Sequence, residues 1–173
     1  MAEEIVNKVS KSPLVTLDLG DYYPVGERKM LDIVPWLYEG VMLREKDFRE
    51  KVSQHDWNQY QDAFVAVHCS ADAIVPQWAY MLLAAHLAPY ARKVVYGNEA
   101  TLEAFLMEAA IDNIEVQQYE DKPVIVKGCG DKPIPNHAYL HLAARLQPVV
   151  KNLMFGEACS TVPVYKKKKA AQR

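Results

Sequence analysis

One segment pattern occurs twice in this chain and constrains its fold more than any other feature. Residues 63–80, AFVAVHCSADAIVPQWAY, combine an apolar strand, a cysteine, a polar turn and a helix that begins at a proline. Residues 124–139, VIVKGCGDKPIPNHAY, repeat this plan, and each copy ends in Val/Ile-Pro-x-x-Ala-Tyr. Apolar runs without alternation are typical of strands covered on both faces. The repeat therefore predicts two strand–helix units of a mainly parallel sheet.

The segments around these copies continue the alternation of strands and helices. Further strands are expected at residues 14–19, 29–33, 93–96 and 161–165, and helices at 46–54, 74–90, 101–111 and from Pro135 to a stop at Gly156. The first two strands flank turn residues and are expected to form a hairpin at a sheet edge, and 114–119 a further strand or hairpin arm. This order predicts an α/β fold, a single domain with a mainly parallel open sheet, helices on both faces and an antiparallel edge.

Composition favours one globular domain over residues 1–165, followed by a basic disordered tail at 166–173. Of the 173 residues, 50% are hydrophobic and 24% are charged, and the net charge is −2. These values argue against intrinsic disorder and against a dominant nucleic-acid-binding surface. No apolar run reaches the roughly 18 residues of a membrane span, and residues 1–10 are too polar for a secretory signal. We therefore expect a cytoplasmic protein that binds neither nucleic acid nor membrane.

The three cysteines are the candidate functional residues. Their odd number and long spacing argue against a disulfide framework. Cys69 and Cys129 follow predicted strands and precede predicted helices, at the sheet edge where open α/β sheets bind ligands. Helix amino termini favour the thiolate, which is both the nucleophile and the metal ligand. The alternative is that these cysteines are buried and act as small hydrophobic residues.

A third cysteine extends this site to a metal-binding hypothesis. Cys159 follows the expected helix stop, and its loop would have to cross to the edge that holds Cys69 and Cys129. Three sulfur ligands suit zinc or iron better than magnesium or calcium. Asp72 is a candidate fourth ligand, although it is also placed to be the N-cap of the following helix.

Other polar residues give weaker signals. Lys127 precedes Cys129 by two residues and would assist a nucleophile, as would His137, which lies four residues before His141 on one predicted helix. His68 is expected to be structural because it points to the sheet face opposite Cys69. The sequence contains no G-x-G-x-x-G, P-loop, G-x-S-x-G or C-x-x-C motif, so nucleotide binding, serine hydrolysis and thioredoxin chemistry lack support.

Several longer motifs resemble those of one protein family. They are LVTLDLGDYYP, GERKMLDI, EKDFRE, HDWNQY, CSADAIVPQWAYMLL, KGC and FGEACSTVPVYK. Together they are similar to the domain of unknown function 2480 family, found mainly in Bacteroidetes, over nearly the whole chain. The resemblance implies an uncharacterised, cytoplasmic, single-domain protein whose genes neighbour those of iron–sulfur cluster assembly. The family's cysteine motifs correspond to Cys69, Cys129 and Cys159, whereas His68 has no place in its pattern.

These observations lead to a cysteine-based accessory protein that binds a transition metal, zinc or iron, with iron–sulfur assembly proteins as expected partners. One alternative is an enzyme with a cysteine nucleophile for sulfur or acyl transfer. Another is a noncatalytic partner-binding domain whose cysteines only pack. A homodimer is also expected, because residues 74–90 are apolar on more than one helical face.

Overall fold

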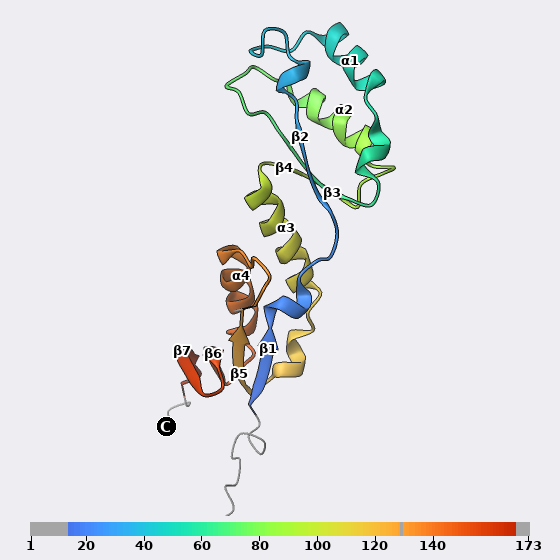
Figure 1. The fold of residues 1–173 in the computed structure, drawn as a ribbon. Helices are drawn as coiled ribbons and strands as arrows, with labels where there is room; N and C mark the ends of the chain where they lie inside the picture. Colours follow the sequence, from blue (N-terminus) through green and yellow to red (C-terminus); the bar gives the residue numbers. More distant parts are fainter. Residues whose placement is uncertain (1–13, 129, 169–173) are drawn as a thin grey trace, which may run out of the picture. The chain divides into compact units, whose positions relative to one another are not determined.

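The computed structural model describes residues 14–128 and 130–168, which fold into two compact units (Figure 1). Unit 2 is the continuous segment Val25–Leu106, and unit 1 combines the residues before and after it. Helices alternate with mainly parallel strands, so the predicted α/β class is confirmed. The prediction of a single folding domain concerns whether the two units unfold together, and it stays a prediction.

Unit 2 contains a three-stranded parallel sheet with helices on both faces. Its strands are β2 (Arg28–Asp32), β3 (Phe64–His68) and β4 (Lys93–Tyr96), in the order β2-β3-β4. Helices α1 (Glu45–Gln54) and α2 (Gln77–Leu87) pack on the face that carries Val65 and Val67. The opposite face, with Phe64, Ala66 and Val95, packs against Leu102 and Leu106 of α3 (Glu99–Asp112). Both faces of β3 are therefore buried, as its unbroken apolar run predicts.

Unit 1 contains a four-stranded sheet in the order β1-β5-β6-β7. Its strands are β1 (Val15–Asp18), β5 (Pro123–Lys127), β6 (Asn152–Glu157) and β7 (Ser160–Lys166). The first three are parallel, and β7 pairs with β6 in the antiparallel direction. One face packs against α4 (Asn136–Leu146) and against Met107 and Ile111, which belong to the second half of α3.

The two units repeat the same plan at a displacement of 59 residues. Strand β3 begins at residue 64 and β5 at 123, α2 begins at 77 and α4 at 136, and β4 begins at 93 and β6 at 152. The 3-10 helices η4 (Trp57–Tyr60) and η5 (Val116–Tyr119) keep this displacement. Asp62 and Asp121 have φ angles of 55° and 51°, and their amides donate to the equivalent carbonyls of Tyr90 and Val149. The sequence repeat is thus part of a larger internal repeat of the fold.

Two expectations about sheet organisation were wrong. The strands that lead to Cys69 and Cys129, β3 and β5, belong to different sheets and not to one. Strands β1 and β2 do not form a hairpin either, because each is an edge strand that pairs in parallel with the central strand of its own sheet. The antiparallel edge is confirmed, but it lies at β6 and β7, where a tight turn joins two consecutive strands.

The segment after α4 also differs from expectation. The helix ends at Leu146, and not at Gly156, because Pro148 cannot continue the helical hydrogen bonding. Residues 152–157 then form β6, a strand that the sequence pattern did not predict. Where a strand or hairpin arm was expected at residues 114–119, Val116–Tyr119 form η5, and the Glu115 side chain accepts a hydrogen bond from the Gln117 amide.

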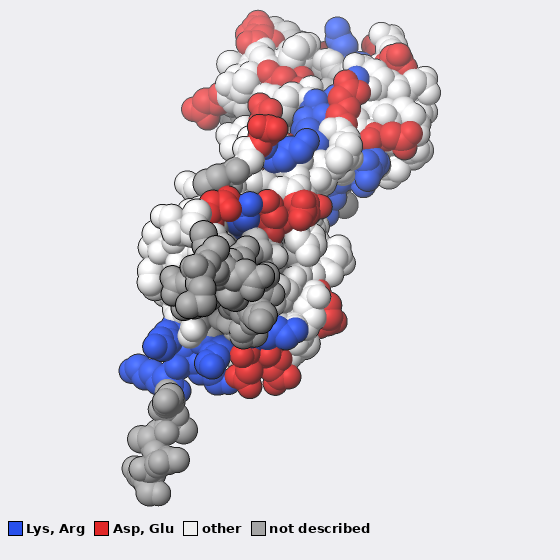
Figure 2. Space-filling view, turned by 60° about the horizontal axis from the view of Figure 1, so that its bottom comes forward, with Lys and Arg blue, Asp and Glu red and all other residues white. Residues whose placement is uncertain are grey.

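Charged residues of both signs alternate over the face drawn in Figure 2, where a basic group toward the lower end lies next to an acidic one. In the segment predicted to be a basic tail, Lys166 belongs to β7, and Lys167 Nζ lies 2.6 Å from Asp121 Oδ1. This ion pair raises the pKa of Lys167 and lowers that of Asp121. Residues 169–173 lie outside the described part of the chain.

Candidate functional site

Cys69 lies at the carboxyl end of β3, the central strand of the unit 2 sheet. The preceding residues Val65, Ala66 and Val67 are buried, and burial decreases at His68 and Cys69, which are partly exposed. The Cys69 thiol donates a hydrogen bond to the Ala71 carbonyl at 3.3 Å. This hydrogen bond orients the thiol at the carboxyl edge of the sheet, which is where open α/β sheets bind ligands.

The turn after Cys69 is fixed by Asp32, the last residue of β2. Its carboxylate accepts from the Ser70 hydroxyl at 2.5 Å, from the Ser70 amide at 3.2 Å and from the Val34 amide at 3.1 Å. Burial alone would raise the pKa of Asp32, but these hydrogen bonds outweigh it and lower the pKa below its ordinary value. The ionised carboxylate thus joins the ends of two neighbouring strands next to Cys69.

Replacing Asp32 by Ala should lower the free energy of unfolding by about 1 kcal/mol near neutral pH, since a capping acceptor is lost. Because the pKa is lowered in the folded state, this stabilisation is complete above the ordinary value of 3.8 and is lost as pH falls through the folded-state pKa. Urea unfolding of wild type and variant should therefore converge on acidification. The exposed Asp72→Ala variant is the control, and a gap that does not change with pH would refute the role of the ionised group.

Two tyrosines lie near the same end of the sheet. Burial, together with the neighbouring Tyr96, raises the pKa of Tyr80 to about 12. The two rings meet edge to face with centroids 5.0 Å apart. His68 Nδ1 is buried and has no hydrogen-bond partner among the described residues. A thiol, a carboxylate, two phenols and an imidazole thus gather at the edge where parallel sheets bind ligands.

The described residues do not form a metal site by themselves. Within residues 14–128 and 130–168, no group of three or more His, Cys, Asp or Glu side chains is placed to hold a metal ion. Asp72 is exposed, and it is not the N-cap of α2, which is Pro76. Cys159 is exposed in the turn between β6 and β7, in the other unit from Cys69. Cys129 lies outside the described residues, so the convergence of three cysteines stays a prediction.

The internal repeat corrects the proposed equivalence of Cys69 and Cys129. At the 59-residue displacement of the flanking strands and helices, Cys69 corresponds to Gly128, and Ser70 to position 129. The Tyr139 hydroxyl donates to the Gly128 carbonyl at 3.1 Å, and a Cβ atom at Gly128 would overlap that hydroxyl. A side chain in the place of Cys69 is therefore excluded from unit 1 unless Tyr139 moves.

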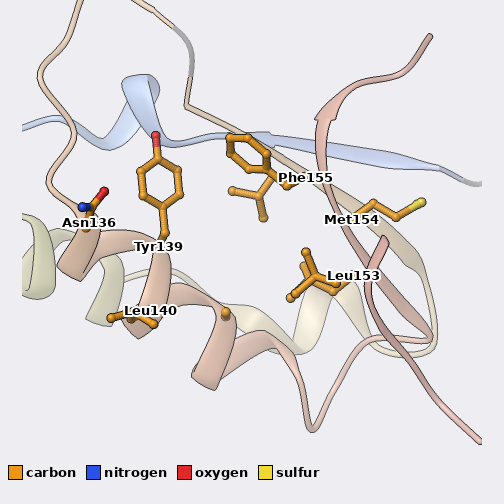
Figure 3. A pocket seen from close by; sticks show the side chains of 9 residues that line it. Asn136, Tyr139, Leu140, Leu153, Met154 and Phe155 are labelled. Carbon is orange, nitrogen blue, oxygen red and sulfur yellow. The ribbon is translucent and has the colours of Figure 1, made fainter. Parts of the chain in front are cut away.

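An apolar pocket of about 440 Å³ lies in unit 1 between α4 and the β6–β7 hairpin (Figure 3). It is lined by Val126, Asn136, Tyr139, Leu140, Ala143, Leu153, Met154, Phe155 and Val164. Leu140 is 74% exposed and Val164 56% exposed, so the apolar surface continues onto the rim. Sequence reasoning missed this pocket because it did not predict β6.

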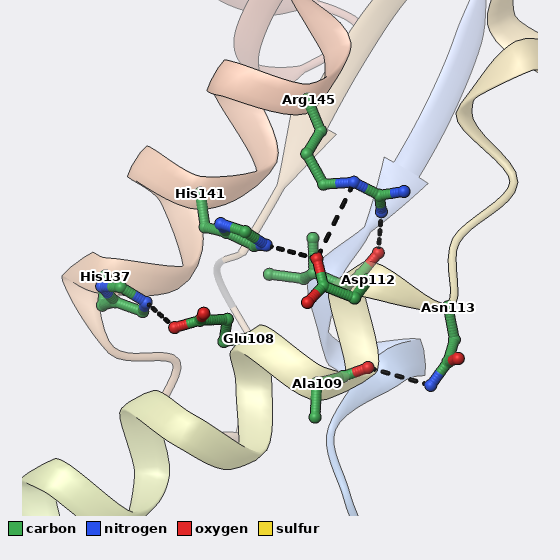
Figure 4. Close-up of polar contacts among 8 residues, drawn as sticks. Glu108, Ala109, Asp112, Asn113, His137, His141 and Arg145 are labelled. Carbon is green, nitrogen blue, oxygen red and sulfur yellow. Dashed lines mark hydrogen bonds and ion pairs between the residues drawn. The ribbon is translucent and has the colours of Figure 1, made fainter.

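The histidines of α4 pair with carboxylates of α3 (Figure 4). His137 Nε2 lies 2.8 Å from Glu108 Oε2, and His141 Nε2 lies 2.7 Å from Asp112 Oδ1. The guanidinium group of Arg145 on α4 also donates a hydrogen bond to the Ile111 carbonyl of α3. These contacts join the two helices, which is a structural role. Neither histidine belongs to the unit that contains Cys69.

Residues 55–57 connect α1 to η4 and are held by local hydrogen bonds. Asp56 caps η4 by accepting from the Asn58 amide, and the Trp57 indole donates to the Val52 carbonyl at 3.0 Å. His86 stacks on Trp57 with ring centroids 5.1 Å apart. Burial lowers the pKa of His55, and the negative charge of Asp56 opposes that effect.

The amino-acid sequence matches the model of one protein family over nearly its whole length. The family model described as "Protein of unknown function (DUF2480)" covers residues 3–167. The chain belongs to this family. No curated protein and no solved structure matches the chain. Among the described residues, no helix has the length and apolar character needed to cross a membrane.

Proposed function

We propose that the protein works through the Cys69 thiol at the carboxyl edge of the unit 2 sheet. The observation that carries this proposal is the position of Cys69. It is partly exposed after a parallel strand whose residues 64–67 are buried, and the Asp32–Ser70 contacts hold the turn that follows it. The Cys69 side chain also packs against the core beneath α1 and α2, but its partial exposure leaves the thiol accessible at the edge where open α/β sheets bind ligands.

The ligand that we propose is a thiophilic metal ion, zinc or iron, in an accessory protein of iron–sulfur assembly. Sulfur donors favour these metals. The described side chains do not supply three ligands, so the proposal requires Cys129 and Cys159, with Asp72 as a further candidate. The family resemblance to proteins encoded near iron–sulfur assembly genes supports this context, and the assembly proteins are the proposed partners.

The second candidate is an enzyme in which Cys69 is a nucleophile. A nucleophile needs only one thiol, and Cys69 is the single cysteine of residues 25–106, the segment that forms unit 2. Lys127 and His137, which were expected to assist the nucleophile, both lie in unit 1 and form ion pairs there. Lys127 Nζ lies 3.0 Å from Glu157 Oε1, and His137 pairs with Glu108. The ion pair with Glu157 also raises the pKa of Lys127, which makes this residue a poorer base.

Elemental analysis of protein purified without a histidine tag separates the two candidates. For a metal site we expect about one zinc or iron per chain, lost in each of Cys69→Ser, Cys129→Ser and Cys159→Ser. Thermal unfolding of each variant shows whether it remains folded. Metal retained in Cys69→Ser would refute the metal proposal. Metal-free wild type whose Cys69 is alkylated much faster than Cys159 would support the nucleophile, whereas equal alkylation rates would contradict any special role for Cys69.

A further inference from the structure

The internal repeat reveals a surface that is covered in unit 1 and open in unit 2. Strands β4 and β6 occupy equivalent places in their sheets. Strand β4 follows β3 in the order β2-β3-β4, and β6 follows β5 in the order β1-β5-β6-β7. In unit 1, β6 also pairs with β7, through Leu153 with Tyr165 and Phe155 with Val162. In the described residues, β4 pairs only with β3. Strand β4 therefore has an open edge at the place where its counterpart binds an antiparallel strand.

The backbone of β4 is oriented to accept such a strand. The Gly97 amide donates to the Val67 carbonyl of β3 at 3.0 Å. Because successive residues of a strand direct their backbone groups to opposite sides, Val94 and Tyr96 direct theirs away from β3. These two residues correspond to Leu153 and Phe155 of β6, which lie opposite Tyr165 and Val162 of β7.

The side chains around this edge are unusually apolar for an exposed surface. Tyr96 is 65% exposed and Met81 of α2 is 73% exposed. Ala84 of α2 is also exposed, and Phe105 of α3 helps to line a hollow of about 280 Å³ over β4. The counterparts of Met81, Ala84 and Tyr96 in unit 1 are Leu140, Ala143 and Phe155, which line the apolar pocket beside β7. Exposed apolar side chains thus flank the edge of β4 on both faces of the sheet, Met81 and Ala84 on the α2 face and Phe105 on the α3 face.

We propose that this surface, Met81, Ala84, Val94, Tyr96 and Phe105, binds the same surface of a second copy of the chain. A twofold axis perpendicular to the sheet places β4 of the two copies antiparallel, which is the direction in which β7 pairs with β6. The two three-stranded sheets become one six-stranded sheet. The α2 helices of the two copies lie on its same face and cover Tyr96 and Met81.

The register that pairs the outward-facing residues is self-complementary. Val94 of one copy lies opposite Tyr96 of the other, and the two copies of Val95 face each other at the axis. Lys93, the charged residue of β4, then lies opposite the partner's Gly97, so that two ammonium groups do not meet. An edge strand that is paired in this way is also protected from unspecific association.

Sedimentation analysis over a wide range of protein concentration tests the dimer. We expect the wild type to dimerise at micromolar concentrations. Met81→Lys and Tyr96→Lys should each raise the dissociation constant about tenfold or more, because a charge would be buried without a partner. Met30→Lys is the matched control. Met30 is a 41% exposed residue of β2, the opposite edge strand of the same sheet, and this variant should dimerise like the wild type.

The midpoint of thermal unfolding is a second test of the dimer. A substitution that only destabilises the monomer lowers the midpoint equally at all protein concentrations, whereas loss of the dimer removes its dependence on concentration. The wild-type midpoint should rise with protein concentration, and those of Met81→Lys and Tyr96→Lys should not, while all midpoints agree at the lowest concentration. A wild type that stays monomeric over the whole range would overturn the proposal. A dimer that both lysines leave intact, or that Met30→Lys dissociates, would also overturn it.

Discussion

Replacing Phe48 by Ala should lower the free energy of unfolding of unit 2 by about 3 to 5 kcal/mol. Phe48 is fully buried where α1 meets α2, and its ring contacts Trp36 and Trp78 edge to face at centroid distances of 5.9 and 6.0 Å. Removing the ring loses its burial and leaves a cavity whose aromatic walls cannot collapse fully.

Urea denaturation followed by tryptophan fluorescence and by circular dichroism measures this change. The three tryptophans all lie in unit 2, so fluorescence reports on that unit alone, whereas circular dichroism reports on both. Val25→Ala, which shortens an apolar side chain at a 79% exposed position of the same unit, should cost less than about 1 kcal/mol. A comparable loss of unfolding free energy in the two variants would contradict the burial of Phe48 in the core.

The same experiment tests the prediction of one folding domain. If the units unfold together, fluorescence and circular dichroism give coincident transitions, and Phe48→Ala shifts both equally. If the units unfold separately, the substitution shifts the transition seen by fluorescence. A second transition, seen only by circular dichroism, then stays at the urea concentration that it has in the wild type. The latter result would contradict the single-domain prediction.

Replacing Glu103 by Ala should cost about 2 to 4 kcal/mol, because it breaks a largely buried ion pair and leaves the guanidinium group of Arg28 without its carboxylate. Arg28 Nε lies 2.6 Å from Glu103 Oε1 and Nη2 lies 3.3 Å from Oε2, and the two side chains are 16% and 13% exposed. The guanidinium also donates to the Gly26 carbonyl and lies over the Phe64 ring. This bidentate pair ties β2 to α3.

An exposed pair in the same unit provides the control. Glu45 and Arg49 are 2.9 Å apart on α1 with side chains 64% and 53% exposed, so Glu45→Ala should cost about 0.5 kcal/mol or less. The cost of Glu45→Ala should also fall with added salt, whereas that of Glu103→Ala should change little. Equal costs in urea denaturation at high salt would contradict the structural role of the buried pair.

The pattern of apolar residues predicted the elements whose buried faces can be identified from their own sequence. Strand β3 was predicted from its unbroken apolar run, and α1 from Phe48 and Val52, which lie four residues apart on one face and are both buried. Pairing between strands could not be read in this way. The Val15–Val124 pair joins residues far apart in sequence, and one apolar strand resembles another in composition. For this reason a single sheet was expected where two exist.

The candidate site was only partly accessible to sequence reasoning. The repeated motif located Cys69 at a strand end, but Asp32, which binds the following Ser70, is distant in sequence and has no motif of its own. Equating Cys69 with Cys129 was an error of one residue, which the helices and strands around them correct. The signal that would have revealed β6 is Pro148, which ends α4 as Pro89 follows α2 in the first copy.

The order of the strands along the chain has a consequence for biosynthesis. Unit 2 is continuous, and its sheet is complete once β4 has left the ribosome. Strand β1 is made before all of unit 2, yet it pairs with β5, in which Val124 is the partner of Val15. The nascent chain must therefore keep β1 unpaired while an entire unit folds next to it. We expect unit 2 to form first on the ribosome, and the closure of β1 onto β5 to be the slow step in which an exposed strand is most open to aggregation.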